Sequence, residues 1–306
     1  MYLKKLILPA IILLTLNLSA QNVPSYLPTN GLVGWWPFSG NAIDSSANGN
    51  NGVVYNSALT TDRFGKVNAA YAFNGVDSRI EVPDAASLRC QKITVSVWIL
   101  NNSIGTPGQI IYKGSLNATG EAYSINCNLN SVFADIKIGS NCTSGIGWQN
   151  LRSKQKAVQG SWEHIVATYD GQTYKMYKNG TLDTSKLIAG LIDNCIGGEL
   201  RFGFNHVANL NNGNSFNGVI DDIAIWNRAL AVNEINQMYA SDTTQCGIGN
   251  TGVNICNPQR SLHVKDVLRL EPRSFSPPNP SKGDMYFDGT INKLRVYDGT
   301  IWRDCW

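Results

Sequence analysis

The sequence predicts an all-β protein whose main domain is a sandwich of two antiparallel sheets. From Gly31 to about Ala240, short runs that alternate apolar and polar residues are separated by turns rich in glycine and asparagine. The chain contains 29 glycines and only 15% charged residues. The Asp-Gly and Asn-Gly pairs at 170–171 and 179–180 are typical of tight hairpins. These features favour one sandwich domain over residues 31–240.

The first residues have the features of a signal peptide. Lys4 and Lys5 precede an apolar run over 6–16, and small residues follow at the expected cleavage position. The run is shorter than the roughly 20 residues that a membrane-spanning helix needs. We therefore expect residues 1–20 to be removed and the mature chain, which begins with a proline-containing lead-in at 21–30, to be secreted or held at the cell surface.

The run ITVSVWIL has the clearest alternation of an internal strand. Ile93, Val95, Val97 and Ile99 lie on one face of such a strand, and Trp98 lies on the other. We expect the aliphatic face to fill the space between the sheets and Trp98 to lie on the outer surface.

The stretch FNGVIDDIAIWNRALAVNEINQMY at 216–239 predicts a strand followed by a short amphipathic helix. Read at period two, Asp221 shares a strand face with Val219, Ile223 and Ile225. A carboxylate in that position must be paired, hydrogen-bonded or metal-bound, because burying a lone charge costs several kcal/mol. The apolar residues in and just before the helix are Leu230, Ile235, Met238 and Tyr239.

Five blocks, in this order, resemble the laminin-G-like domains of the concanavalin A-like lectin/glucanase superfamily. The blocks are residues 31–54, 73–88 with 93–100, 162–182, 199–205 and 216–239. Together they cover about two-thirds of the chain. The resemblance implies a jelly-roll sandwich. It implies no single function, because the fold hosts lectins, glycosidases, adhesins and inert spacers.

The resemblance also implies a structural calcium ion, because related domains often hold one between the first loop and the last strand. Asn41 and Asp44 lie in that loop, and Asp221 lies in that strand. Oxygen donors of this kind suit calcium. The alternative is that Asp221 accepts backbone hydrogen bonds from the first strand and fixes the closure of the sandwich.

Carbohydrate sites of this fold usually combine an aromatic platform with planar polar side chains. The candidate ligand-binding residues that the resemblance implies are Trp98, Tyr112, Trp148, Asn205 and His206. The alternative for each aromatic residue is packing in the core.

Charge and motifs argue against two other functions. The formal net charge is +3, and two of the positive charges belong to the predicted signal peptide, which is too little for a nucleic-acid binder. A glycoside hydrolase needs two positioned carboxylates, and the Glu-x-Asp-x-x-Glu and Glu-x-Asp-x-Glu motifs of laminarinase-type relatives are absent. We predict a non-catalytic binding or adhesion protein, with carbohydrate as the favoured ligand. The alternatives are a glycoside hydrolase of the same fold and a purely structural surface or stalk protein.

Seven cysteines follow the predicted signal peptide, and export would permit disulfides. The candidate pairs are Cys127 with Cys142, Cys246 with Cys256, and Cys90 with Cys195. Cys305 is then left over, and this odd number leaves every pairing open.

The C-terminal part predicts a linker followed by a small second module. Residues 241–260 are a linker by composition, and 261–306 contain an aromatic-Asp-Gly-Thr motif at both 287–290 and 297–300. Two Asp-Gly turns between apolar runs predict a three-stranded meander, which is too small to be stable alone. We therefore expect the module to dock on another surface or to form a homo-oligomer. It resembles C-terminal segments of phage tail-fibre-like and stalk-bearing bacterial surface proteins, and this resemblance favours homo-oligomerisation.

Overall fold

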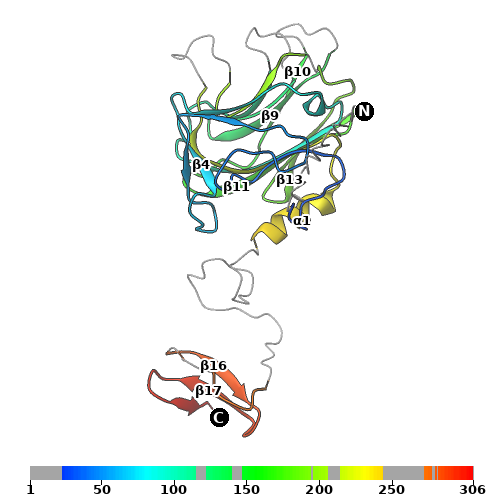
Figure 1. Ribbon diagram of the computed structural model, residues 1–306. Helices are drawn as coiled ribbons and strands as arrows, with labels where there is room; N and C mark the ends of the chain where they lie inside the picture. The colour runs from blue at the N-terminus through cyan, green and yellow to red at the C-terminus, as the bar shows by residue number, and fades with distance from the viewer. Residues whose placement is uncertain are drawn as a thin grey trace, which may run out of the picture. The chain divides into compact units, whose positions relative to one another are not determined.

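Two antiparallel sheets face each other in the main part of the chain, as the sequence predicts (Figure 1). The computed structural model describes residues 23–114, 122–139, 147–193, 196–205, 214–243, 272–277, 280 and 282–305. The chain divides into two compact units, residues 1–256 and 257–306, and each is described separately. None of the helices in the described segments is long and apolar enough to cross a membrane.

The first unit contains an eight-stranded sheet, sheet A, and a seven-stranded sheet, sheet B. The order of sheet A is β13 (Thr181–Leu187), β12 (Thr173–Lys178), β11 (Trp162–Tyr169), β6 (Ile93–Asn101), β15 (Asn217–Trp226), β4 (Ala70–Asn74) and β3 (Ala58–Thr60), with β1 (Leu32–Trp36) also paired to β15. The order of sheet B is β10 (Trp148–Arg152), β9 (Ser131–Lys137), β8 (Tyr123–Asn128), β7 (Gly108–Gly114), β14 (Glu199–Phe202), β5 (Arg79–Val82) and β2 (Val53–Tyr55). The described helical elements are the 3₁₀ turn η1 (Ala86–Leu88) and helix α1 (Val232–Thr243).

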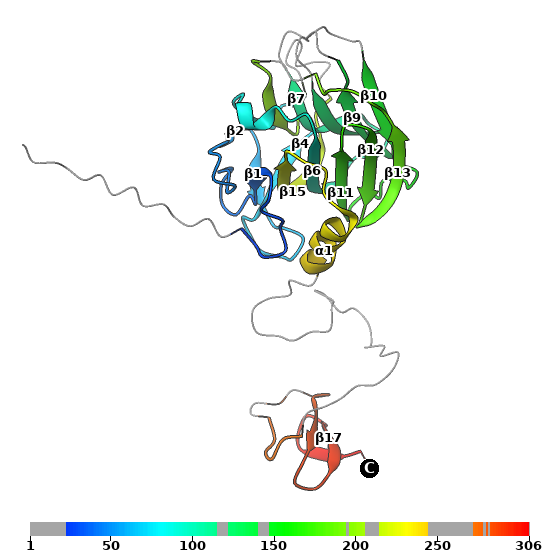
Figure 2. The ribbon, with the colours of Figure 1, turned by 90° about the vertical axis from the view of Figure 1, so that its right-hand side faces the viewer.

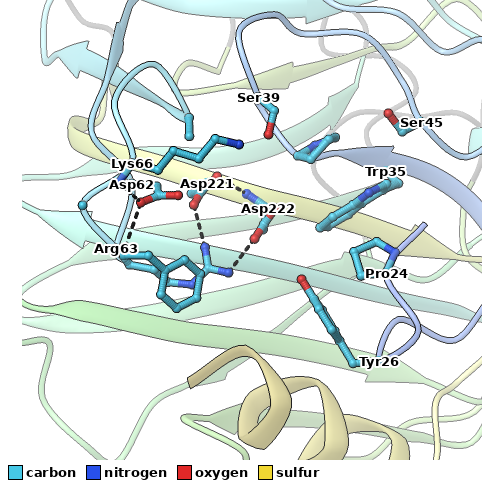
Figure 3. A pocket seen from close by; sticks show the side chains of 14 residues that line it. Pro24, Tyr26, Trp35, Ser39, Ser45, Asp62, Arg63, Lys66, Asp221 and Asp222 are labelled. Atoms are coloured by element: carbon cyan, nitrogen blue, oxygen red, sulfur yellow. Dashed lines mark hydrogen bonds and ion pairs between the residues drawn. The ribbon is translucent and has the colours of Figure 1, made fainter. Parts of the chain in front are cut away.

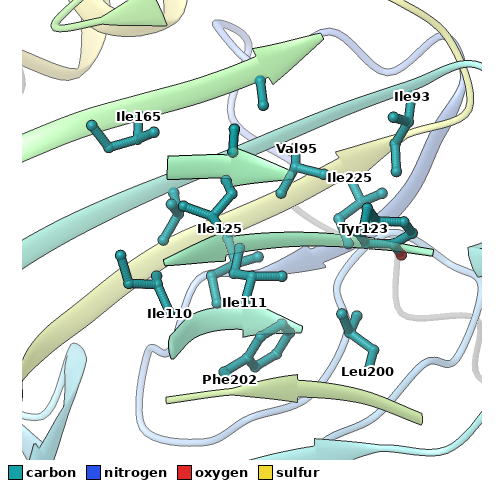
Figure 4. Close-up of a cluster of buried hydrophobic side chains, with 14 of the residues drawn as sticks. Ile93, Val95, Ile110, Ile111, Tyr123, Ile125, Ile165, Leu200, Phe202 and Ile225 are labelled. Atoms are coloured by element: carbon teal, nitrogen blue, oxygen red, sulfur yellow. The ribbon is translucent and has the colours of Figure 1, made fainter. Parts of the chain in front are cut away.

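The core lies between the sheets and confirms the predicted facing of β6. The aliphatic residues of β6 are buried there together with residues of sheet B such as Ile111 and Ile125 (Figure 4). Burying an aliphatic side chain of this size stabilises the fold by about 1.5–3 kcal/mol. The alternation of apolar and polar residues along β6 therefore selects which of its faces points inward.

The outer face of sheet A is covered as well, which the alternation of a strand does not reveal. Helix α1 lies against this sheet (Figure 2) and contributes Ile235 and Met238 to a second apolar cluster. Trp226 belongs to the same cluster, and its Nε1 donates to the carbonyl of Pro28 at 2.6 Å. The helix predicted after the last strand is confirmed, with Leu230 just before it.

Strand β15 contains a β-bulge that corrects the predicted facing of Asp221. The pairing of β15 with β6 shifts register between Asp221 and Ala224, and Asp222 has a φ of 45°. Ile223 and Ile225 lie in the core, whereas Asp221 pairs with Trp98 on the outer face. The prediction that Asp221 shares a face with these isoleucines is wrong, because the extra residue of a bulge reverses the alternation.

Asp44 fastens the first loop to the first strand. Its carboxylate accepts the backbone N–H groups of Trp35 at 2.9 Å, Ser46 at 2.8 Å and Asn50 at 2.8 Å. A role of this type is the predicted alternative to calcium binding for Asp221. In the structure Asp44 performs it.

The C-terminal unit contains a three-stranded sheet of β16 (Met285–Asp288), β17 (Lys293–Tyr297) and β18 (Trp302–Asp304). The predicted meander is thus confirmed. Asp288 and Asp298 use the same device at the two turns: each Oδ1 accepts both the backbone N–H and the hydroxyl of the threonine two residues later. The repeated Asp-Gly-Thr motif is therefore a repeated turn structure.

Candidate functional site

The β15 bulge places two consecutive carboxylates beside one guanidinium on the outer face of sheet A. Arg63 Nη1 lies 2.5 Å from Asp221 Oδ2, and Nη2 lies 2.5 Å from Asp222 Oδ2. The side chains of Arg63 and Asp221 are only 5% and 2% exposed. Burial and the neighbouring Asp222 carboxylate raise the pKa of Asp221 well above its ordinary value, while Arg63 acts in the opposite direction.

A short turn and two aromatic rings hold Arg63 in place. Asp62 Oδ1 accepts the N–H groups of Phe64 and Lys66, each at 2.8 Å, which shapes the turn. The guanidinium carbon of Arg63 lies 4.4 Å from the ring centre of Phe64 and 4.7 Å from that of Trp98. Cation–π contacts of this kind strengthen when they are shielded from water.

Arg63, Phe64 and the two carboxylates line a cavity of about 630 Å³, which we call the Arg63 pocket. Its lining residues are Pro24, Tyr26, Trp35, Pro37, Ser39, Ser45, Asp62, Arg63, Phe64, Gly65, Lys66, Ala69, Asp221 and Asp222. In Figure 3, Tyr26 and Trp35 lie on one side of Asp222, and Asp62 and Lys66 lie on the other. The volume and the mixture of rings with a few polar groups are typical of a small-ligand site.

A Ser–His pair lies under the same face of sheet A, but it lacks the features of a nucleophile and its base. Ser96 Oγ lies 2.8 Å from His164 Nε2, and the adjoining cavity measures only about 10 Å³. Nδ1 of His164 has no hydrogen-bond partner among the described residues, so no carboxylate orients the ring. Burial and the positive charge of Arg63 lower the pKa of His164 to about 3.

Sheet B presents a second polar surface, on the side away from the core. The register of its strands aligns one residue from each of six neighbouring strands: Glu81, Arg201, Tyr112, Ser124, Asp135 and Asn150. Arg201 is paired with Glu199 and Glu81. Toward the β10 edge, Asp135 accepts hydrogen bonds from three neutral side chains.

The structure separates the sequence-predicted ligand-binding residues. Trp98 is only 6% exposed, and its ring is stacked with His164 and Tyr239 and covered by Arg63. The expectation that Trp98 forms an open sugar platform is therefore wrong, because α1 and the Arg63 turn cover that face of the sheet.

The other candidates lie elsewhere. Tyr112 and the half-buried Trp148 share the outer face of sheet B. Asn205 is half-buried just after β14, and His206 lies outside the described residues. Sequence reasoning missed Arg63, although an arginine was the simplest partner for a buried acid.

The residues proposed for calcium do not fit an ion. Asn41 Oδ1 accepts the N–H of Ile43 at 2.9 Å, Asp44 is used by backbone N–H groups, and Asp221 is paired with Arg63. In the segments that the structure covers, no group of three or more His, Cys, Asp or Glu side chains could hold a metal.

No disulfide joins the cysteines that the structure describes, Cys90, Cys127 and Cys305. The thiol of Cys127 donates to the carbonyl of Gly108 at 3.4 Å. The predicted partners Cys142 and Cys195, and the pair Cys246 and Cys256, lie outside the described residues, so the three pairings stay predictions.

Comparisons with known proteins agree with this architecture. A family model described as the concanavalin A-like lectin/glucanases superfamily (Laminin_G_3) matches residues 74–236. No curated protein matches the sequence.

Solved structures with the same fold include domain 4 of AbnA, an extracellular GH43 arabinanase from Geobacillus stearothermophilus, in complex with arabinotriose. The match has 20% identity and a TM-score of 0.55, and it covers 68% of this chain and 98% of that one. The binding domain of Paraclostridial Mosquitocidal Protein 1 matches with 20% identity and a TM-score of 0.56, covering 71% of this chain and 54% of the other. The botulinum neurotoxin DC binding domain in complex with SialylT matches with 15% identity and a TM-score of 0.54, covering 70% of this chain and 52% of the other. The chain thus spans about half the length of the toxin domains that it matches, and identities this low show the fold alone.

Proposed function

Because the chain belongs to the concanavalin A-like lectin/glucanase superfamily, we propose that it is a secreted, non-catalytic protein that binds or adheres to carbohydrate. The observation that carries this proposal is the Arg63 pocket, which combines aromatic walls with fixed polar groups. The sugar-bound complexes among the structural neighbours, with arabinotriose and SialylT, support the same ligand class.

The pocket suits a sugar because its components are rigid and chemically mixed. Tyr26 and Phe64 are half-buried rings that can pack against the apolar faces of a sugar. Asp222 and Lys66 provide an acceptor and a donor within the same cavity. Since Arg63 already holds the two carboxylates, little ordering would be needed on binding, and preorganisation of this kind favours affinity.

Hydrolysis is the weaker alternative. A glycosidase needs one protonated and one ionised carboxyl group on either side of the bond that is cleaved. Asp221 and Asp222 instead share one guanidinium, which keeps both on the same side of the pocket. The remaining alternative is a structural role without any small ligand.

A glycan array with the mature chain tests the proposal. We expect binding to a subset of glycans and no release of reducing ends on prolonged incubation. Lys66→Ala and Tyr26→Ala should weaken glycan binding at least fivefold. The matched controls Lys92→Ala and Tyr55→Ala, at exposed positions outside the pocket, should leave glycan binding unchanged. An array without signal would reject carbohydrate binding, and reducing-end release would make the protein a hydrolase.

For the C-terminal unit we propose a role in self-association. The register of its sheet places Met285 and Phe287 on one face with Leu294 and Val296. Met285 is 54% exposed, and apolar surface of this kind generally marks an association site. Docking onto another surface of the same chain is the alternative.

A further inference from the structure

The end of sheet B nearest β10 carries a network of hydrogen-bonding side chains arranged around one carboxylate. Ile125, Ala134 and Leu151 of β8, β9 and β10 are aligned and point into the core. The residues between them point outward. They form two adjacent rows, one of Ser124, Asp135 and Asn150 and the other of Asn126, Phe133 and Arg152.

Asp135 is the centre of this network. It accepts hydrogen bonds from Ser124 Oγ at 3.0 Å, Asn126 Nδ2 at 2.6 Å and Asn150 Nδ2 at 2.6 Å. All three donors are neutral, and Asp135 itself is only 8% exposed. A buried carboxylate without such donors would be costly, so Asp135 fixes the positions of the side chains around it.

The consequence for the two asparagines is a defined orientation of their amides. Each gives one N–H to Asp135, and the planar geometry of an amide directs its carbonyl oxygen away from that bond. Asn126 is half-buried and Asn150 is exposed. Each therefore offers an acceptor and a second N–H donor on the outer side of the sheet, which matches the hydroxyl groups of a polyol.

The aromatic ring of Phe133 lies beside these amides. Phe133 is half-buried, and the guanidinium carbon of Arg152 lies 5.6 Å from its ring centre. Arg152 is in turn held by a hydrogen bond to Ser131 Oγ at 3.2 Å. A flat ring next to oriented amides suits a sugar, whose surface alternates C–H and O–H groups.

We propose that Asn126, Phe133, Asp135, Asn150 and Arg152, the Asp135 platform, form a second carbohydrate site, on the opposite sheet from the Arg63 pocket. The inference rests on the proposed carbohydrate-binding function. The ligand is a neutral glycan chain. Both amide nitrogens lie 2.6 Å from an oxygen of the same Asp135 carboxylate, so the two asparagines are placed to contact neighbouring hydroxyl groups of one sugar unit in that chain. In this site the asparagines and Phe133 touch the ligand, and Asp135 is a positioning residue.

Two outer faces that each bind glycan would make one sandwich bivalent. A polysaccharide that engages both sites gains avidity of about 10²–10⁴ over either site alone when the geometry allows it. The platform therefore predicts that long polymers bind much more tightly than short oligosaccharides.

The test uses the full mature chain and three soluble polymers: arabinan and laminarin as neutral probes and polygalacturonate as an acidic one. Affinity electrophoresis measures binding, and hydrogen exchange locates it. We expect a neutral polymer to protect backbone amides in β9 and β10 as well as in the 62–66 turn. Asn150→Ala and Phe133→Ala should abolish the protection of β9 and β10 and weaken binding at least fivefold. Asn217→Ala, an exposed asparagine on sheet A, is the matched control.

A double-mutant cycle separates positioning from a general structural effect of Asp135. Asp135→Asn should weaken binding in the wild-type background and add little in a background that carries both Asn126→Ala and Asn150→Ala, because Asp135 acts through these two amides. Full additivity would contradict the positioning role.

The outcomes also separate this inference from the function on which it rests. If wild type binds, the 62–66 turn is protected and the β9–β10 variants bind like wild type, the platform is rejected while the Arg63 pocket stands. If the platform variants lose binding and Lys66→Ala binds like wild type, the platform is supported and the Arg63 pocket is rejected as a sugar site. If none of the polymers and no glycan on the array binds, both proposals fail.

Discussion

Arg63 is the residue on which the outer face of sheet A depends, since it is the shared partner of the buried Asp221 and the half-buried Asp222. Its partners are 158 and 159 positions away in sequence. Sequence alone showed that Asp221 needed a partner, but no periodicity connects residues at that separation. The partner became visible only when the fold brought the 62–66 turn onto β15.

Arg63→Met should destabilise the protein by about 3–5 kcal/mol, because it leaves the buried Asp221 and the half-buried Asp222 without their cation. Urea unfolding monitored by tryptophan fluorescence measures the change. Lys66→Met, in the same turn but exposed, is the control and should change stability by less than about 0.5 kcal/mol. Adding Asp221→Asn and Asp222→Asn to Arg63→Met should restore part of the lost stability, because the unpaired carboxylates are then removed. A loss below 1 kcal/mol in the single variant would contradict the role of Arg63.

His164 should make the protein sensitive to acid. Its folded-state pKa of about 3 lies below the 6.5 of an unperturbed histidine, so between these values the unfolded chain binds a proton that the folded chain does not. Stability is therefore full above pH 6.5 and falls by about 1.4 kcal/mol per pH unit below it. His164→Phe should have a flatter dependence between pH 6.5 and 4 in urea titrations. Equal slopes for the two proteins would show that His164 is not the group responsible.

Calcium should leave the stability unchanged. The oxygens of Asp44 and Asp221 are already engaged by N–H donors, whereas a bound ion would raise stability by about 2.7 kcal/mol at a hundredfold excess over its Kd. Melting temperatures in EDTA and in millimolar calcium are the measurement. A clear rise with calcium would restore the predicted site at Asn41, Asp44 and Asp221.

At the scale of elements, strand faces were predictable where the alternation was unbroken. The four aliphatic residues of β6 lie in the core as their period of two indicates. The alternation places Trp98 on the outer face but does not tell whether water or another element covers that face. Here α1 covers the outer face, and the ring centre of its Tyr239 lies 5.8 Å from that of Trp98, with the two rings stacked.

Strand β15 shows where the alternation fails. A bulge adds one residue, and Asp221 and Asp222 are flanked directly by isoleucines, with no glycine or proline next to them to mark it. The candidate carbohydrate residues were only partly predictable for a similar reason. Tyr112 and Trp148 could be suspected as aromatics, but their common face on sheet B follows from strand pairing across the sheet.

The bulge itself can be tested by comparing two substitutions of Asp222. Both Asp222→Ala and Asp222→Gly remove the carboxylate, so they lose the same ion pair. Asp222 has a φ of 45°, a conformation that costs a non-glycine residue roughly 1–2 kcal/mol. The glycine variant should therefore be more stable than the alanine variant by about 1 kcal/mol in urea unfolding. The opposite order would mean that the bulge rearranges when the carboxylate is removed.

At the scale of the whole molecule, the C-terminal unit should determine the oligomeric state. Its sheet leaves an aliphatic face that includes Met285 and Val296. Light scattering of the full mature chain at micromolar concentration should report an oligomer, and a chain that ends at Asp242 should be a monomer. Met285→Lys with Val296→Lys in the full chain should also give a monomer. If the full chain is already monomeric, docking is the better explanation of this face.

The position of β15 in sheet A has a consequence for how the protein is made. This strand, the last of the sandwich among the described residues, pairs with β6, β4 and β1, so the centre of the sheet is incomplete until residue 226 is available. A growing chain must therefore keep the edges of β6 and β4 unpaired through most of its synthesis. Contacts between such distant residues also slow folding, and open strand edges favour aggregation. A chain terminated before β15 should accumulate as insoluble material, whereas one terminated after α1 has every strand that the sandwich needs.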